Sequence, residues 1–250
     1  TRKESSAASD VYKRQLLTKI LDAEQKLSVQ VHPDDTYAYE HENGEYGKTE
    51  CWYILDAKPG AEIIYGTNAQ SHEELNEMID QRDFEHLFRR VPVHKGDFFF
   101  VPAGTVHGIG AGIMILETQQ SSDTTYRIYD YDRQDKNGNK RPLHLEKSKD
   151  VIQISEESPN VVPQTEVIEN HKCTTFVQNS FFTVTHWDIQ GTLNYMKPRE
   201  FVLVSVLDGQ GQLVTDGEIY DIKKGNHFIL TAEDLDNVFE GEFSLIISYV

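Results

Sequence analysis

The segment 95–108, KGDFFFVPAGTVHG, constrains the fold of this chain more than any other. Its aromatic run, residues 98–101, follows a Gly-Asp turn and ends at Pro102, which cannot donate a hydrogen bond to a sheet. We therefore predict a short buried strand here. Gly104 supplies the backbone freedom of a tight turn, and His107 begins the next predicted strand. The segment therefore holds a histidine at the mouth of a β structure.

The spacing of Gly96, Pro102, Gly104 and His107 resembles the second signature motif of the cupins, which are small β-barrels with a metal inside. Four residue types at four fixed offsets rarely coincide by chance, so the motif is specific. The alternative is a hairpin whose histidine only satisfies a backbone group. Candidate metal ligands elsewhere in the chain are needed to distinguish a cupin metal site from a simple hairpin.

Composition excludes several classes of partner. The chain has 250 residues, with 24 basic against 41 acidic ones and a formal net charge of -17. Binding to nucleic acid or to an anionic membrane depends on clusters of Lys and Arg, so we expect neither. Two cysteines are too few for a disulfide framework, and there is no secretory signal and no apolar run of about 18 residues. We expect a cytoplasmic protein.

Strand alternation brings candidate metal ligands together. In the predicted strand 27–32, Gln30 and His32 share a face, and in the predicted strand 48–55 so do Lys48 and Glu50. Together with His107, the residues His32 and Glu50 give two imidazoles and a carboxylate, with Gln30 as a further candidate. Such a set leaves coordination positions open, as in catalytic zinc sites, and it also matches the facial triad of iron oxygenases.

The pattern of elements predicts an all-β fold with two cupin-like jelly-roll β-barrels. Residues 1–15 are expected to be a non-native or disordered leader, and the strand pattern at residue 16 suggests that the natural protein extends further upstream. We predict a metal-binding cupin domain over 16–134 with a helical insert at about 68–90, where Ser71 and Glu74 form a capping box. The segment 34–47 is expected to be irregular, and residues 135–142 are the predicted linker.

The C-terminal domain, 143–250, is predicted to be a cupin-like barrel without metal. A faint internal repeat aligns KGDFFFVPAG at Lys95 with KGNHFILTAE at Lys224. This alignment places His107 on Asp236, with no histidine nearby. The second half therefore keeps the scaffold and lacks the ligands.

Four segments, LLTKILDAEQKLSVQVHPDD, GKTECWY, FVPAGTVHGIGAG and ETQQSSDTTYRIYDYDR, together resemble the type I mannose-6-phosphate isomerases in their short bacterial form. The resemblance is close over roughly residues 16–145 and loose beyond. It implies interconversion of mannose 6-phosphate and fructose 6-phosphate on a zinc-bearing cupin barrel, followed by a barrel without metal. The family's upstream portion, with a Gly-Glu-Trp-like segment near the active site, is not found in this sequence.

The same resemblance implies roles for individual residues. One zinc ion would be held by His32, Glu50 and His107, and Gln30 matches a ligand of the related longer enzymes. Arg127 matches the catalytic arginine. Lys48 and Asp123 match positions assigned to proton transfer or to orienting groups.

An aldose to ketose conversion moves a proton between adjacent carbons through an enediol. Lys48 could carry that proton if desolvation lowers its pKa, and Arg127 would stabilise the enediolate or the phosphate. A salt bridge on a very acidic protein is the alternative for both residues. Two other functions stay open: a cupin oxygenase with iron at the same ligands, and a sugar-binding bicupin without chemistry.

Overall fold

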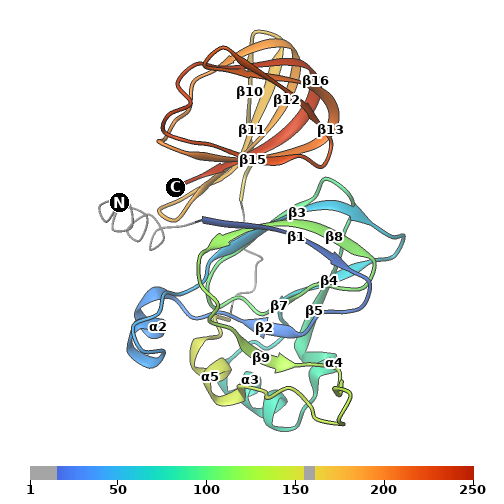
Figure 1. Ribbon diagram of the computed structural model, residues 1–250. Helices are drawn as coiled ribbons and strands as arrows, with labels where there is room; N and C mark the ends of the chain where they lie inside the picture. Colours follow the sequence, from blue (N-terminus) through green and yellow to red (C-terminus); the bar gives the residue numbers. More distant parts are fainter. Residues whose placement is uncertain (1–15, 155–160) are drawn as a thin grey trace. The chain divides into compact units, whose positions relative to one another are not determined.

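The computed structural model describes residues 16–154 and 161–250, which fall into two compact units, Leu17–Asn160 and Val161–Val250 (Figure 1). The predicted leader, residues 1–15, lies outside the described residues. Both units consist mainly of antiparallel strands, as the sequence predicts. Among the described residues, no helix combines the length and the hydrophobicity that a membrane crossing requires.

The first unit contains two sheets. The four-stranded sheet has the order β1-β8-β3-β6 and the five-stranded sheet the order β5-β4-β7-β2-β9. The strands are β1 (Leu16–Ala23), β2 (Val29–Val31), β3 (Glu50–Ala57), β4 (Glu62–Thr67), β5 (Phe88–Pro92), β6 (Phe98–Val101), β7 (His107–Gly108), β8 (Ile113–Gln120) and β9 (Tyr126–Tyr129).

Two apolar cores hold this unit together. One core combines side chains of both sheets, including Trp52 and Ile54 from β3 and Ile63 from β4. The other joins the five-stranded sheet to the helices, with Val29 and Ile128 from the sheet among its members. Consecutive strand residues point to opposite faces, so each strand of the five-stranded sheet can contribute to both layers.

Helices α3 (His72–Asp80) and α4 (Phe84–Leu87) occupy the predicted insert. The hydroxyl of Ser71 accepts a hydrogen bond from the Glu74 amide, and the Glu74 carboxylate accepts one from the Gln70 amide, which is a reciprocal cap close to the predicted one. Leu75 and Ile79 bury the apolar side of α3. The insert covers the five-stranded sheet with helices.

The prediction of an irregular segment at 34–47 is wrong in part, because α2 (Asp35–His41) forms there. The Asp34 carboxylate caps this helix by accepting a hydrogen bond of 2.8 Å from the Tyr37 amide. Ala38 is the only residue of the helix that is buried. A helix with so little apolar surface leaves no periodic pattern in the sequence.

The division between the units falls after the predicted linker at 135–142 and not at it. Helix α5 (Leu145–Val151) belongs to the first unit, where Ser148 is buried and Ile152, directly after the helix, enters the core beneath the five-stranded sheet. The predicted C-terminal domain starting at 143 therefore begins too early. A short helix with a single buried residue gives the sequence little to mark it.

The second unit is one sheet of seven strands in the order β10-β11-β12-β16-β13-β14, with β15 paired to β13. Its core is apolar and includes Phe239 and Leu245. The strands are β10 (Gln164–Ile168), β11 (His171–Gln178), β12 (Thr183–Tyr195), β13 (Val202–Thr215), β14 (Glu218–Lys223), β15 (His227–Leu230) and β16 (Asn237–Tyr249).

The internal repeat has a structural counterpart. Strands β6 and β15 each have four residues, and each follows a turn with a glycine of positive φ, which is 95° at Gly96 and 85° at Gly225. These two glycines are aligned by the repeat. The equivalent turn and strand thus occur once in each unit.

Candidate metal centre

His32, Glu50 and His107 meet inside the first unit. His32 directly follows β2 and His107 begins β7, both in the five-stranded sheet, while Glu50 begins β3 in the four-stranded sheet. One nitrogen or oxygen atom from each lies within 4.8 Å of the others, and all three side chains are buried. The cluster therefore joins side chains of both sheets.

Turn chemistry places the second histidine. Pro102 follows the end of β6, and Gly104 has a φ of 86°, which a residue with a side chain rarely adopts. A Cβ atom at Gly104 would also lie 2.9 Å from the Val151 carbonyl oxygen. The Gly104 amide donates a hydrogen bond of 2.8 Å to the carbonyl of His32, so the loop leading to His107 is tied to the other histidine.

Backbone carbonyls orient both imidazoles. The Nδ1 atom of His32 lies 2.8 Å from the Thr124 carbonyl oxygen, and Nδ1 of His107 lies 2.8 Å from that of Thr105. Because a carbonyl only accepts, each Nδ1 carries the proton and each Nε2 keeps its lone pair. These Nε2 atoms lie 3.4 Å (His32) and 3.5 Å (His107) from the two carboxylate oxygens of Glu50.

The protonation of this set suits a divalent cation. Burial lowers the pKa of His32 and lowers that of His107 to about 3, so both imidazoles are neutral at pH 7. Burial alone would raise the pKa of Glu50, but the positive charge of Lys48, 2.9 Å away, holds it well below its ordinary value. His32 Nε2 is buried and has no hydrogen-bond partner among the described residues. Two neutral nitrogens and a carboxylate fit a metal ion of the zinc or iron type.

Two further side chains border the cluster. Gln30 pairs with His107 across the sheet, and its Nε2 lies 3.3 Å from His107 Nε2. Rotation of this amide would present its oxygen to an ion at the same place. Trp52 Nε1 donates a hydrogen bond of 2.9 Å to Glu50 Oε1, which fixes the carboxylate from the side.

Lys48 lies beside Glu50, as the alternation predicts, although β3 begins only at Glu50. Its Nζ is 2.9 Å from Glu50 Oε2, and its side chain is almost completely buried. Burial alone would lower the pKa of Lys48, but the charges of Glu50 and Glu117 outweigh it and raise the pKa. The lowered pKa on which the predicted proton shuttle depends is therefore not found, and the amine is a cation at pH 7.

Asp123 and Arg127 lie near this group in different ways. Asp123 is exposed and lines a cavity of about 570 Å³, and its charge helps to raise the pKa of Lys48. Arg127 pairs with Gln30 in the sheet, so both residues share the face that carries the cluster. Arg127 Nη1 donates a hydrogen bond of 3.0 Å to the Pro142 carbonyl, while its Nε is buried without a partner among the described residues.

Sequence reasoning missed a second buried carboxylate. Glu117 lies opposite Trp52 in the pairing of β3 with β8, and its Oε2 is 3.4 Å from Lys19 Nζ. Burial and the charge of Glu50 raise the pKa of Glu117. The sequence feature that could have identified Glu117 is its place directly after the apolar run of β8. A glutamate in a buried strand has to be paired or protonated.

The fold and this cluster together define a β protein of the cupin class with a candidate metal centre. Residues 1–59 match the family model described as phosphomannose isomerase type I, catalytic domain. Residues 172–250 match the model described as mannose-6-phosphate isomerase, cupin domain.

Curated relatives extend the match over most of the chain. A mannose-6-phosphate isomerase of Streptococcus mutans is 52% identical over 234 residues, which are 94% of this chain and 73% of the relative. Mannose-6-phosphate isomerase ManA of Bacillus subtilis is 49% identical over 235 residues, 94% of this chain and 75% of the relative.

A solved structure agrees with these relatives. The crystal structure of a Bacillus subtilis mannose 6-phosphate isomerase has a TM-score of 0.89 at 46% identity, covering 94% of this chain and 75% of that one. The chain belongs to the type I mannose-6-phosphate isomerase family. The resemblance of the four quoted segments to this family is thereby confirmed.

Proposed function

We propose that the protein interconverts mannose 6-phosphate and fructose 6-phosphate through an enediol, as a zinc-dependent aldose-ketose isomerase. The observation that carries the proposal is the buried set of two oriented, neutral imidazoles around one ionised carboxylate. Curated relatives with the name mannose-6-phosphate isomerase support the choice of substrate. We further propose a cytoplasmic location and a cupin jelly roll for each unit.

His32, Glu50 and His107 would hold the zinc ion, with Gln30 as a further ligand. Zinc bound there would act as a Lewis acid that stabilises negative charge on the sugar oxygens during proton transfer. The pattern of hydrogen bonds supports this assignment, since ligand histidines commonly donate their second N–H to a carbonyl or carboxylate. Iron at the same ligands is the alternative that metal analysis distinguishes.

The other polar residues divide between charge stabilisation and proton transfer. Lys48 is a buried cation beside the cluster and would donate a hydrogen bond to the substrate oxygen on which charge develops. Arg127 has a guanidinium with an uncommitted buried Nε and would stabilise the enediolate or the phosphate. Asp123 would orient the sugar from the rim of the adjoining cavity.

Glu117 is the residue that we assign to proton transfer in place of Lys48. Its pKa is raised by burial and by Glu50, which brings a carboxyl group closer to the working range of a general acid or base. Lys19 Nζ lies 3.4 Å from Oε2 of this carboxylate. A general base near neutral pH is what proton removal from a sugar carbon requires.

A coupled assay tests the proposal. Protein loaded with zinc is expected to convert fructose 6-phosphate to mannose 6-phosphate, and His107→Ala is expected to lose both the bound metal and the turnover. His86→Ala is the matched control, because this histidine is 76% exposed and lies outside the cluster. Full turnover in the His107→Ala variant would contradict the proposal, and iron content with oxygen uptake in place of isomerisation would favour an oxygenase.

A further inference from the structure

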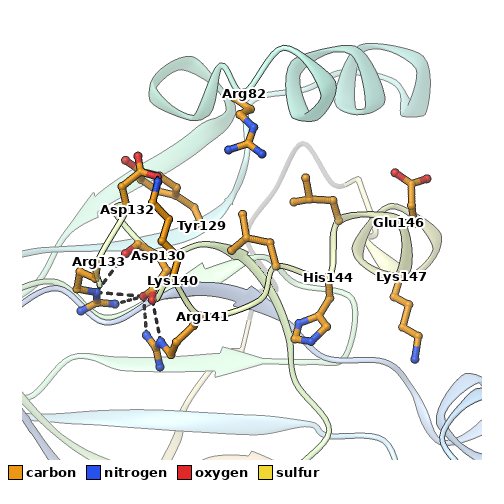
Figure 2. A pocket seen from close by; sticks show the side chains of 12 residues that line it. Arg82, Tyr129, Asp130, Asp132, Arg133, Lys140, Arg141, His144, Glu146 and Lys147 are labelled. Atoms are coloured by element: carbon orange, nitrogen blue, oxygen red, sulfur yellow. Dashed lines mark hydrogen bonds and ion pairs between the residues drawn. The ribbon is translucent and has the colours of Figure 1, made fainter. Parts of the chain in front are cut away.

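A second cavity of about 610 Å³ lies at the edge strand β9 of the five-stranded sheet. Three parts of the chain line it: Arg82 after helix α3, the end of β9 with the loop that follows, and the first turn of α5. Figure 2 shows Arg82 reaching toward the cavity from the helical insert, with Arg141 on the opposite side. None of the candidate metal ligands contributes to its lining.

The charge of this cavity is opposite to that of the chain. Five cationic side chains line it against three carboxylates, an excess of two positive charges in a chain with a net charge of -17. The cations are Arg82, Arg133, Lys140, Arg141 and Lys147, and the carboxylates are Asp130, Asp132 and Glu146. The cations repel one another, so placing them together raises the electrostatic energy of the folded chain.

Several donors in the cavity are free for a ligand. The Arg82 side chain makes no hydrogen bond or ion pair with any other described residue, and Arg141 uses only Nε and Nη2 for its bonds to Asp130. His144 accepts a hydrogen bond from the Arg127 amide through Nδ1, so its Nε2 carries a proton that can be donated. Two guanidinium groups and an imidazole N–H form a set suited to phosphate oxygens.

The cavity and the metal cluster lie on opposite faces of the sheet. A register shift occurs where β2 pairs with β9, so Tyr129 pairs with the buried Val29 and its ring lies 4.8 Å from that of Phe84 in α4. This places Tyr129 on the face that the helices cover. Gln30 and Arg127 belong to the other face, which carries His107. The cavity is therefore not part of the metal centre.

We propose that this cavity is a second anion site, which binds the phosphate group of a small phosphate monoester separately from the metal centre. A phosphate monoester carries close to two negative charges at pH 7, which matches the excess charge of the lining. The volume is in the range of small-molecule sites. Arg82 and Asp132 line the cavity with positive φ values of 57° and 55°, a backbone strain that often accompanies functional sites.

The site has a direct connection to Arg127. Pro142 and His144 follow Arg141 along the chain, and Arg127 bonds to both: its Nη1 donates to the Pro142 carbonyl, and its backbone pairs with His144 in both directions. An anion held by Arg141 would restrain this segment and hence Arg127. This coupling rests on the role proposed for Arg127, whereas the binding itself does not.

Titration of the full chain with inorganic phosphate, followed by calorimetry, tests the binding. Arg82→Ala and Arg141→Ala are each expected to weaken phosphate binding by about tenfold, since a lost charge-assisted hydrogen bond has an effect of this size. Lys136→Ala is the control, because Lys136 is exposed in the same loop and does not line the cavity. Equal affinities in the wild type and both cavity variants would overturn the proposal.

Kinetics separate the two sources of phosphate. If the cavity takes a separate ligand, the KM for fructose 6-phosphate without added phosphate is unchanged in Arg82→Ala, and saturating fructose 6-phosphate does not displace inorganic phosphate. A KM that rises by the same factor as the phosphate dissociation constant would overturn the separate site and assign the cavity to the substrate. Inorganic phosphate is expected to change kcat in the wild type, and about tenfold more phosphate is expected to be needed for the same change in Arg82→Ala. A constant wild-type kcat would refute the coupling to Arg127.

Discussion

The Nζ atom of Lys48 lies 2.9 Å from Oε2 of Glu50, and both side chains are buried. The lysine thus compensates the charge of a carboxylate that would otherwise be isolated from solvent. In the proposed reaction the same cation donates a hydrogen bond to the substrate oxygen that gains negative charge. A substitution of Lys48 can therefore change two separate quantities, the zinc content and kcat.

Lys48→Met is expected to lower kcat by roughly 100-fold while zinc content stays near one ion per chain, because the ligands remain and the stabilising cation is lost. Metal analysis and the coupled assay measure the two effects in one preparation. Lys95→Met, at an exposed lysine, is the control. A variant that loses zinc in proportion to its activity would show that Lys48 acts only by holding Glu50.

Trp52→Phe is expected to weaken zinc binding by about 10-fold to 100-fold, because the hydrogen bond from Nε1 to Glu50 is lost while the aromatic packing remains. Trp187→Phe is a matched control. Its Nε1 donates to the hydroxyl of Thr185, two residues earlier on the same strand, as Trp52 does to Glu50. Competition with a chelator measures both affinities, and an equal change in the two variants would contradict a role for Trp52 at the centre.

Arg127→Ala is expected to reduce kcat/KM by about 100-fold or more at unchanged zinc content, which is the usual effect of removing a group that stabilises developing charge. Arg90→Ala, at an exposed arginine of β5, is the control. If Arg127 only braces the sheet edge, the variant would instead lose free energy of unfolding and keep its kcat. Urea unfolding and the coupled assay together decide between these outcomes.

Asp130→Asn is expected to destabilise the chain at neutral pH and to have little effect in acid. Burial alone would raise the pKa of Asp130, but hydrogen bonds from Arg141 and Arg133 outweigh it and hold the pKa below its ordinary value. A carboxyl with a lowered folded-state pKa stabilises the protein above its unfolded pKa, and this contribution is lost as the pH falls through the folded value. We expect a difference of roughly 2 kcal/mol at neutral pH.

Urea unfolding of both proteins from about pH 7 to about pH 3 measures this difference. The gap between wild type and Asp130→Asn should stay constant down to the ordinary range of an aspartate and then close. A gap that is independent of pH would show that the ionised carboxylate does not supply the stability.

Much of the cluster of candidate metal ligands could be predicted because its members lie in local sequence patterns. Strand alternation identified Gln30 and His32, and the turn at Gly104 identified His107. Glu117 could not be found in this way. Its nearness to Glu50 depends on the pairing of β3 with β8, which joins segments far apart in the chain.

The missed helices have a common physical cause. Helix α2 buries only Ala38, and α5 has only Leu145 and Val151 as apolar side chains on its seven residues, so neither is long enough to show the repeated apolar pattern by which a helix is recognised. Helix α3 was predictable because Leu75 and Ile79 are buried one turn apart behind a cap. The division of the chain was placed too early for the same reason, since α5 carries the first unit beyond the polar linker.

His144 covers the backbone of Arg127 on the outer side of β9. The Nδ1 atom of His144 accepts a hydrogen bond from the Arg127 amide, and the His144 amide donates one to the Arg127 carbonyl. β9 is the last strand of its sheet, and free amides and carbonyls at such a border invite strands of other molecules to add on. The returning chain occupies these groups at Arg127. Arg127, which is proposed to act in the reaction, therefore also lies where the sheet edge is protected from pairing with a strand of another molecule.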